Sequence, residues 1–248
     1  MKRILAATLL ALSLVAGAQA QQTGATNVAV AANFTEPAKE IAALFRQKTG
    51  YEAVLSFGAS GPFYTQITQD APFQVFLSAD EKRPKDVVDN GFGVADSRTT
   101  YAIGKLVLWS KSLDVTKGED ALKANAFNKL SIANPTAAPY GAAALDALKA
   151  LGVLAAIEPK IVQGNTIAQA FQFIDTGNAE LGFVALSQLA NVTAGTRWIV
   201  PQTLYKPIRQ DVVLLKKGAD DAASKAFVAF LKGPESRAII QKYGYVVE

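Results

Sequence analysis

Four short segments of this sequence join an apolar strand or loop to the start of a predicted helix, and their residue types suit the capture of an anion. In the segment 57–62, small residues follow an apolar strand, Ser60 stands at the expected N-cap, and Pro62 falls in the first turn, where its missing N–H costs nothing. The first N–H groups of a helix have no partner within it, and with the helix dipole they form a site for an anion. One such helix start is common, whereas four in one chain indicate a bound oxyanion.

The other three helix starts carry Asn33, Tyr140 and Ile167. Asn33 can donate hydrogen bonds from its side-chain amide, whereas Ile167 has only its backbone to offer. Each segment is equally typical of a routine helix cap, and Tyr140 alone is typical of a half-buried packing residue. The anion hypothesis therefore depends on all four segments meeting in one cleft.

The sequence excludes much catalytic chemistry, because it contains neither cysteine nor histidine. Disulfides, thiolate metal sites, a Cys nucleophile and a Ser-His-Asp triad are all ruled out. We therefore expect no metal site and no cofactor, and a hydrolase would have to use paired carboxylates. Asp80 is interpreted as a helix cap, and Trp109 and Trp198 as core residues, although tryptophan also stacks on sugars.

The first twenty residues have the three parts of a secretory signal peptide. Lys2 and Arg3 precede an apolar run at 4–16, and Ala-Gln-Ala at 18–20 predicts cleavage after Ala20. The run is too short to span a bilayer, and no cysteine is present to carry a lipid anchor. We expect an exported protein in the periplasm that is not inserted in a membrane.

The charge of the chain is close to neutral. The sequence has 25 basic and 21 acidic residues, a net charge of +4, and removal of Lys2 and Arg3 leaves 23 against 21, or +2. The sequence has no basic run and no basic–aromatic interleaving, so we expect no nucleic-acid partner.

The elements that must position the four segments alternate strand and helix. Strands are predicted at 28–32, 51–57, 75–77, 101–110, 130–133, 181–185 and 211–215, and helices at 35–48, from 60, 80–90, 140–151, from 167, 222–231 and before 244. This alternation predicts parallel sheets with both faces covered by helices. About 228 mature residues, 248 minus 20, suit one large domain or two lobes. Two lobes would require the chain to cross within the apolar strands 101–110 and 210–215.

The chain resembles the periplasmic molybdate-binding proteins, the solute receptors of molybdate ABC transporters. The resemblance covers essentially the whole mature chain and is carried by the segments 31–34, 56–61, 71–80, 132–135, 138–141, 176–180 and 183–188. It implies an α/β, two-lobed periplasmic-binding-protein fold, each lobe a mostly parallel sheet flanked by helices, with the ligand cleft between the lobes. After the signal peptide 1–20, lobe I would comprise 21–102 and 211–248, and lobe II 103–210.

The resemblance also implies which residues hold the oxyanion. Asn33 and Ser60 would bind it from the first lobe, through side chain and backbone N–H. Tyr140 and Ile167 would contribute backbone N–H groups from the second lobe, and Ala32 would lie at the rim. Some family members use a serine in place of the asparagine and a tyrosine hydroxyl where this chain has Ala185, which has no side-chain donor.

The function implied is the capture of molybdate or tungstate and its delivery to an ABC transporter permease by a monomer that is not an enzyme. Two alternatives stay open: the same fold binding sulfate or another tetrahedral oxyanion, and an exported hydrolase using carboxylates. The ligand domain of a transcription regulator is disfavoured by the signal peptide. A shell made only of donors would reject a protonated phosphate, whereas only cavity size would exclude sulfate.

Overall fold

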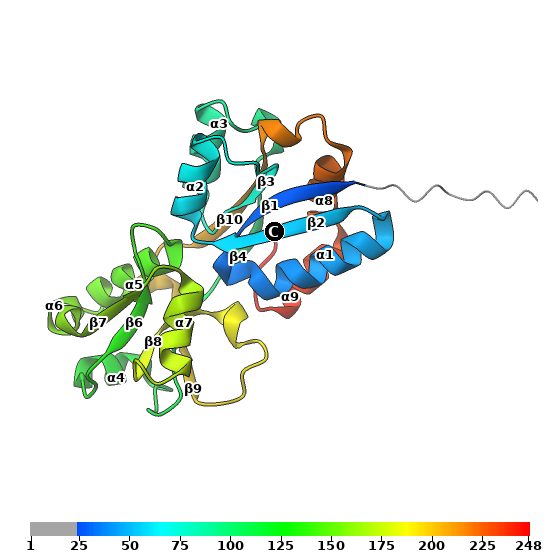
Figure 1. The fold of residues 1–248 in the computed structure, drawn as a ribbon. Helices are drawn as coiled ribbons and strands as arrows, with labels where there is room; N and C mark the ends of the chain where they lie inside the picture. Colours follow the sequence, from blue (N-terminus) through cyan, green and yellow to red (C-terminus); the bar gives the residue numbers. More distant parts are fainter. Residues whose placement is uncertain (1–23) are drawn as a thin grey trace, which may run out of the picture.

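The computed structural model describes residues 24–248, which form two five-stranded sheets with helices packed against each (Figure 1). The predicted signal peptide and its cleavage site lie outside the described residues. The first sheet has the order β2-β1-β3-β10-β4, with β1 at Ala25–Ala31, β2 at Glu52–Gly58, β3 at Val75–Leu77, β4 at Thr99–Gly104 and β10 at Ile208–Leu214. The second has the order β7-β6-β8-β5-β9, with β5 at Leu106–Ser110, β6 at Leu130–Ala133, β7 at Ile161–Gly164, β8 at Leu181–Ala185 and β9 at Thr196–Ile199.

The two sheets share one pattern of strand directions. In the first, β2, β1 and β3 are parallel, and β10 runs antiparallel to both of its neighbours, β3 and β4. In the second, β7, β6 and β8 are parallel, and β5 is antiparallel to β8 and β9. Each sheet therefore has one reversed strand among otherwise parallel ones. The mostly parallel α/β architecture predicted from the sequence is confirmed.

Helices cover both faces of the first sheet, because its parallel strands are joined by helical crossovers. Val28 and Val30 of β1 pack toward one helical layer and Ala29 toward the other, as the alternation of a strand requires. The first layer contains α1 (Thr35–Thr49), α8 (Ala222–Leu231) and α9 (Pro234–Lys242), and the second α2 (Ser60–Thr68) and α3 (Lys82–Asp89). Helix α1 ends as predicted at Gly50, whose φ of 79° gives the left-handed cap that glycine adopts readily.

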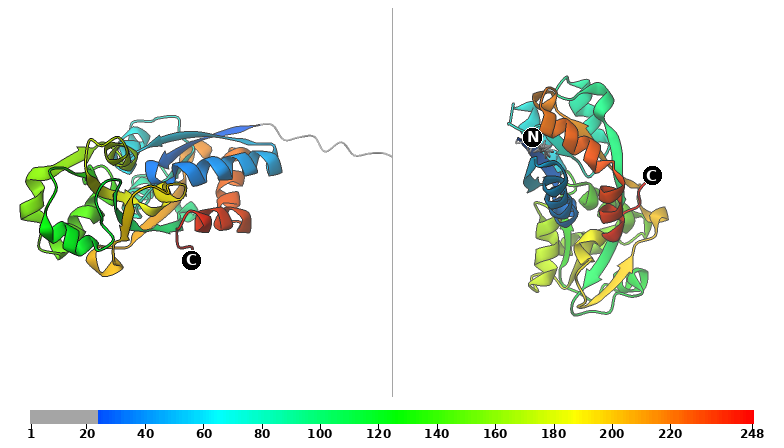
Figure 2. Two further views of the ribbon diagram at one scale, coloured as in Figure 1. Left: turned by 90° about the horizontal axis from the view of Figure 1, so that it is seen from below. Right: turned by 90° about the vertical axis from the view of Figure 1, so that its right-hand side faces the viewer.

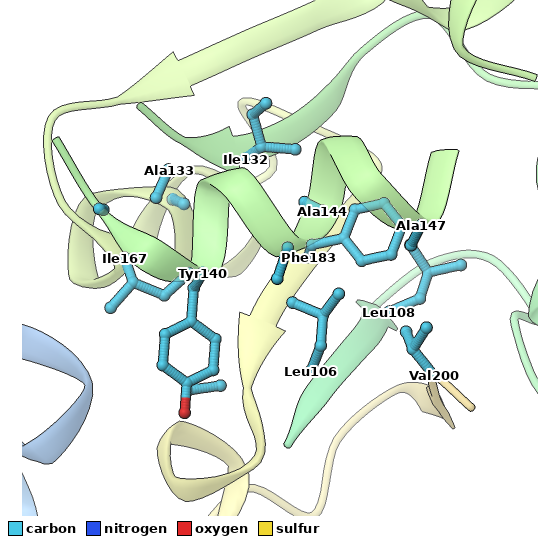
Figure 3. Close-up of a cluster of buried hydrophobic side chains, with 14 of the residues drawn as sticks. Leu106, Leu108, Ile132, Ala133, Tyr140, Ala144, Ala147, Ile167, Phe183 and Val200 are labelled. Atoms are coloured by element: carbon cyan, nitrogen blue, oxygen red, sulfur yellow. The ribbon is translucent and has the colours of Figure 1, made fainter. Parts of the chain in front are cut away.

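The second sheet builds its own core with shorter helices. Leu106 and Leu108 of β5 pack against α5, in the cluster drawn in Figure 3. Trp109 faces the opposite layer, where it is fully buried and its ring stacks on Phe171 at a centroid distance of 5.0 Å. Trp198 packs against the Leu106 cluster, so both tryptophans are packing residues, as predicted. The helices are α4 (Gly118–Ala124), α5 (Pro139–Ala150), α6 (Leu154–Ile157) and α7 (Ile167–Asp175).

The chain crosses between the sheets twice. Lys105 alone separates β4 from β5, so the predicted crossing within 101–110 is present. The second crossing differs from the prediction, because 210–215 does not cross. Gln210 and Asp211 pair with Ala102 and Thr100 of β4, which holds β10 in the first sheet. The chain returns earlier, through 200–207, between β9 and β10.

Two lobes result, one around each sheet, and they lie end to end in all three views (Figures 1 and 2). The first lobe consists of the first sheet with its helices, and the second lobe consists of the second sheet with its helices. Strand pairing does not define lobe limits, so the limits at 102/103 and 210/211 stay a prediction.

Within residues 24–248, no single helix is long and apolar enough to cross a membrane. The helices Pro139–Ala150 and Leu154–Lys160, which are bent by 117° relative to each other, together reach the length and apolar composition of a membrane span.

Candidate anion-binding site

A small cavity lies where helix starts of the two lobes meet. All five residues expected at the site line it: Ala32, Asn33, Ser60, Tyr140 and Ile167. The first three belong to the first lobe, and the other two to the second. The remaining lining residues lie within the segments that carry the family resemblance, although they were not expected at the site: Ala31, Gly58, Ala59, Ala79, Ala138 and Pro139. The structure therefore brings the four predicted helix starts into one place.

Three α-helices begin at this cavity. Ser60 is the first residue of α2, Ile167 the first of α7 and Tyr140 the second of α5. Their N–H groups have no partner within the helix, and among the described residues none accepts a hydrogen bond from them. Each helix also adds a partial positive charge at this end. The cavity is thus a place where negative charge is favoured.

Ser60 differs in detail from its predicted role. The N-cap of α2 is Ala59, and Ser60 lies one position inside the helix. Its Oγ accepts a 2.9 Å hydrogen bond from the backbone N–H of Ala79, because the loop after β3 passes directly beside it. Ser60 is 1 % exposed, and its hydroxyl hydrogen stays available to a ligand in the cavity.

Asn33 lies in the 3-10 helix Ala32–Phe34, between β1 and α1, and its amide is already engaged. Its Nδ2 donates to Gln210 Oε1 at 2.8 Å and to the Tyr245 hydroxyl at 2.9 Å. Its Oδ1 is buried and has no hydrogen-bond partner among the described residues. The predicted donation from this amide to a ligand is therefore not what this conformation displays.

A buried polar network surrounds Gln210 beneath the cavity. Tyr101 donates to Gln210 Oε1 at 3.1 Å, and Gln210 Nε2 donates to the Tyr140 hydroxyl at 3.2 Å. Burial raises the pKa of Tyr245 to about 12 and that of Tyr101 and Tyr140 well above the ordinary tyrosine value. The network is therefore uncharged at neutral pH.

The sequence analysis missed Gln210, Tyr101 and Tyr245 as members of this network. One signal was present, because two polar residues, Gln210 and Asp211, interrupt an apolar strand. Both are almost fully buried, and Asp211 is paired with Arg98 and accepts a 2.8 Å hydrogen bond from Thr100. A polar pair inside a buried strand predicts such partners without identifying them.

Direct contacts hold the two lobes together around the cavity. The N–H of Gly61 donates to the carbonyl oxygen of Ala137 at 2.9 Å, and Arg83 Nη2 donates to that of Thr136 at 2.8 Å. On the other side, Ser187 Oγ donates to the Asn33 carbonyl oxygen at 2.8 Å. These bonds join residues of opposite lobes, so the structure has a closed cleft.

The electrostatics of the cavity come from neutral groups. Its lining contains no Lys, Arg, Asp or Glu. Asp80 and Arg83 lie outside it. The N-cap of α3 is Glu81, one residue later than predicted, although Asp80 accepts the Arg83 N–H at 2.8 Å. Within residues 24–248, no group of three or more His, Asp or Glu side chains could hold a metal ion. The site is suited to an anion held by hydrogen bonds.

Two α/β lobes joined by two chain crossings, with a small anion-favouring cavity between them, define a two-lobed solute-binding protein. The chain belongs to the bacterial extracellular solute-binding protein family, whose model matches residues 26–246.

Within this family, the chain is similar to several molybdate-binding proteins. The molybdate-binding protein ModA of Rhodobacter capsulatus is 55% identical over 96% of this chain and 95% of its own, and that of Azotobacter vinelandii is 53% identical over 91% of each. The solved structure of an Azotobacter vinelandii periplasmic molybdate-binding protein superposes with a TM-score of 0.86 at 40% identity, covering 90% of this chain and 99% of that one. These similarities confirm the family and the two-lobed fold predicted from the sequence.

Proposed function

We propose that this chain captures molybdate or tungstate outside the cytoplasm and delivers it to an ABC transporter permease. The observation that carries the proposal is the convergence of three α-helix N-termini from two lobes on one small cavity without a charged side chain. The printed names of the relatives at 55% and 53% identity support molybdate as the ligand. The periplasm follows from the predicted signal peptide with cleavage after Ala20.

The binding shell in this proposal consists of Asn33, Ser60, Tyr140 and Ile167, with Ala32 at the rim. Each hydrogen bond to a charged oxygen contributes roughly 1.5–3 kcal/mol, and each helix N-terminus roughly 0.3–1 kcal/mol. Six or seven such bonds, less the cost of dehydrating the anion, suffice for submicromolar affinity. Omitting a fixed cation lets the lobes release the anion when the transporter separates them.

The protein acts as a monomeric receptor and not as an enzyme in this proposal. Among the described residues, the cavity lining offers no carboxylate, so the carboxylate hydrolase considered from the sequence lacks its catalytic groups there. The relatives are named as binding proteins, which supports the same conclusion. Turnover of ester or glycoside substrates by the purified protein would contradict it.

Sulfate is the main competing ligand, because it is a dianion like molybdate and differs mainly in size. We expect molybdate and tungstate to bind almost equally and sulfate much more weakly. Competition by sulfate at equal affinity would instead assign the site to sulfate transport.

The test is thermal unfolding of the purified protein with molybdate, tungstate, sulfate or phosphate, with sodium chloride at matched ionic strength as the control. A ligand at 1,000 times its Kd stabilises the folded state by about 4 kcal/mol, which raises Tm by several degrees. We expect a rise with molybdate and tungstate only. No rise with any oxyanion would overturn the proposal.

A further inference from the structure

Gln210 is a side chain that touches both halves of the candidate site. It is fully buried in β10, where its Oε1 accepts from Asn33 of the first lobe at 2.8 Å. Its Nε2 donates to the hydroxyl of Tyr140, which lies in the second lobe, at 3.2 Å. The Oε1 of Gln210 thus accepts a hydrogen bond from one proposed ligand-binding residue, and its Nε2 donates one to the other.

The present orientation of Asn33 is unfavourable for an oxyanion. Both N–H groups of its amide are turned toward Gln210 and Tyr245, and the atom left over is a buried acceptor, Oδ1, with no partner among the described residues. A buried acceptor without a partner is costly, and an acceptor beside an anion cavity repels an oxyanion. An amide has nearly the same shape when rotated by 180°, which exchanges its donor and its acceptor.

Asn33 cannot rotate alone. Its Oδ1 would then face Gln210 Oε1, and two acceptors would oppose each other. If Gln210 rotates as well, its Nε2 donates to Asn33 Oδ1 and the bond between them is kept with its direction reversed. The Asn33 N–H groups then occupy the position of the partnerless oxygen.

The surrounding hydroxyls tolerate the reversal, because each can donate or accept. Tyr140 would donate to Gln210 Oε1 instead of accepting from Nε2. Tyr101 has the Ser78 carbonyl oxygen as an alternative acceptor at 3.2 Å. Tyr245 would donate to Asn33 Oδ1, while Ser187 continues to satisfy the Asn33 carbonyl oxygen at 2.8 Å. In the rotated state, the Asn33 N–H groups are the members of this network that need the ligand as their partner.

We propose that Gln210 is a positioning residue that sets the donor or acceptor character of Asn33, and that oxyanion binding rotates the two amides together. The inference rests on the proposed function, since the ligand must be an oxyanion. It makes Gln210 a determinant of specificity. With the Asn33 amide N–H at the cavity, the site favours an unprotonated oxyanion, whereas with Oδ1 there it would favour a ligand that carries a hydroxyl.

The direct test is NMR of the side-chain amides in the 15N-labelled protein, with Gln210→Met used to assign the Gln210 signals. Without ligand, we expect nuclear Overhauser effects from the Asn33 amide protons to the Tyr245 ring and from the Gln210 amide protons to the Tyr140 ring. Saturation with molybdate should remove both and create effects from Gln210 to the Tyr101 ring. Unchanged effects at saturation would overturn the inference.

The same titration separates this inference from the proposed function. Shifts of the backbone N–H signals of Ser60, Tyr140 and Ile167 report binding by themselves. If they move while the amide contacts stay the same, the function stands and the rotation is wrong. If no oxyanion moves them, both are wrong.

Two substitutions at one position provide an independent measurement. At a pH where its carboxyl is ionised, Gln210→Glu offers only acceptors, so it should hold the Asn33 N–H groups away from the cavity and raise the Kd for molybdate by about 100-fold. Gln210→Met removes the constraint without adding charge and should raise the Kd by only about tenfold. In Gln210→Glu, the Asn33 contact with the Tyr245 ring should persist at saturating molybdate. Loss of that contact, or equal affinities of the two variants, would overturn the inference, and the NMR test on the unaltered protein stands if either variant fails to fold.

Discussion

The backbone N–H of Gly61 donates a 2.9 Å hydrogen bond to the carbonyl oxygen of Ala137, which joins the start of α2 in the first lobe to the loop before α5 in the second. These two segments of the backbone approach so closely that a Cβ on Gly61 would lie 3.1 Å from that oxygen and 3.2 Å from the Ala137 Cα. Glycine at this position therefore permits full closure of the cleft around the cavity.

Gly61→Ala should hinder closure of the cleft without destabilising the fold. Gly61 lies within a helix, so alanine should raise the free energy of unfolding of the ligand-free protein by about 0.4–1 kcal/mol. The added methyl should hold the lobes apart and raise the Kd for molybdate by roughly three- to tenfold, measured by calorimetric titration. Gln66→Ala, an exposed change on the same helix, is the control and should alter neither quantity much. An unchanged Kd in Gly61→Ala would mean that the ligand is bound without this contact.

Ser60→Ala should weaken both the fold and the site. It removes the acceptor for the Ala79 N–H, and both residues are buried. The free energy of unfolding should fall by about 1–3 kcal/mol in urea titrations, and the Kd for molybdate should rise by about tenfold because one donor is lost. Gln66→Ala, on the exposed surface of the same helix, should cost less than about 0.5 kcal/mol. A variant with lower stability and an unchanged Kd would show that Ser60 is mainly a structural residue.

Gly141→Ala should disturb the start of α5. A Cβ at this position would lie 2.1 Å from the carbonyl oxygen of Ala133 at the end of β6, so the helix or the strand must shift. We expect a loss of about 1–3 kcal/mol in the free energy of unfolding and displacement of the neighbouring Tyr140 N–H from the cavity. Chemical denaturation and molybdate titration measure the two effects. Ala142→Ser, at the exposed next position, should leave both nearly unchanged, and wild-type binding by Gly141→Ala would contradict the prediction.

Alkaline pH should destabilise the protein through Tyr245. Burial raises its pKa to about 12, whereas a tyrosine in the unfolded chain loses its proton near pH 10. Between these values the unfolded state binds fewer protons than the folded state, so stability is fully present below pH 10 and falls as the pH rises toward 12. The contribution of this one residue is about 2–3 kcal/mol.

The measurement is the free energy of unfolding of the wild type and of Tyr245→Phe at several pH values from 8 to 12. The variant should be the less stable protein at pH 8, because it lacks the hydrogen bonds to Asn33 and Ser187. The difference between the two proteins should shrink above pH 10. A constant difference across this range would show that Tyr245 does not titrate as expected.

Several features of the fold were predictable because they are local. The alternation of apolar strands with amphipathic helices predicted the α/β class, and Gly50 correctly ended the first helix. The four helix starts were also visible, since small residues, Pro139 and Ser60 mark them in the sequence. The family resemblance then named five residues that the structure places around one cavity.

The second crossing shows where local patterns fail. The strand 210–215 is apolar enough to belong to either lobe, and nothing within it specifies its neighbours. Its place in the first sheet follows from pairing with β3 and β4, which lie more than a hundred residues earlier in the chain. Sequence periodicity reports burial and does not report which strand lies alongside.

The amino-acid sequence by itself determined the class of fold, the absence of cysteine and histidine chemistry, and the helix starts that offer N–H groups, because each depends on composition or on neighbours within a few residues. Only the tertiary structure decided that Asn33 meets Gln210, 177 positions away, and Tyr245, 212 positions away, and that its amide N–H groups are directed at these two residues. Such contacts depend on how the strands pair and how the lobes close, and the orientation of a buried amide is fixed by whichever donors and acceptors this folding brings beside it.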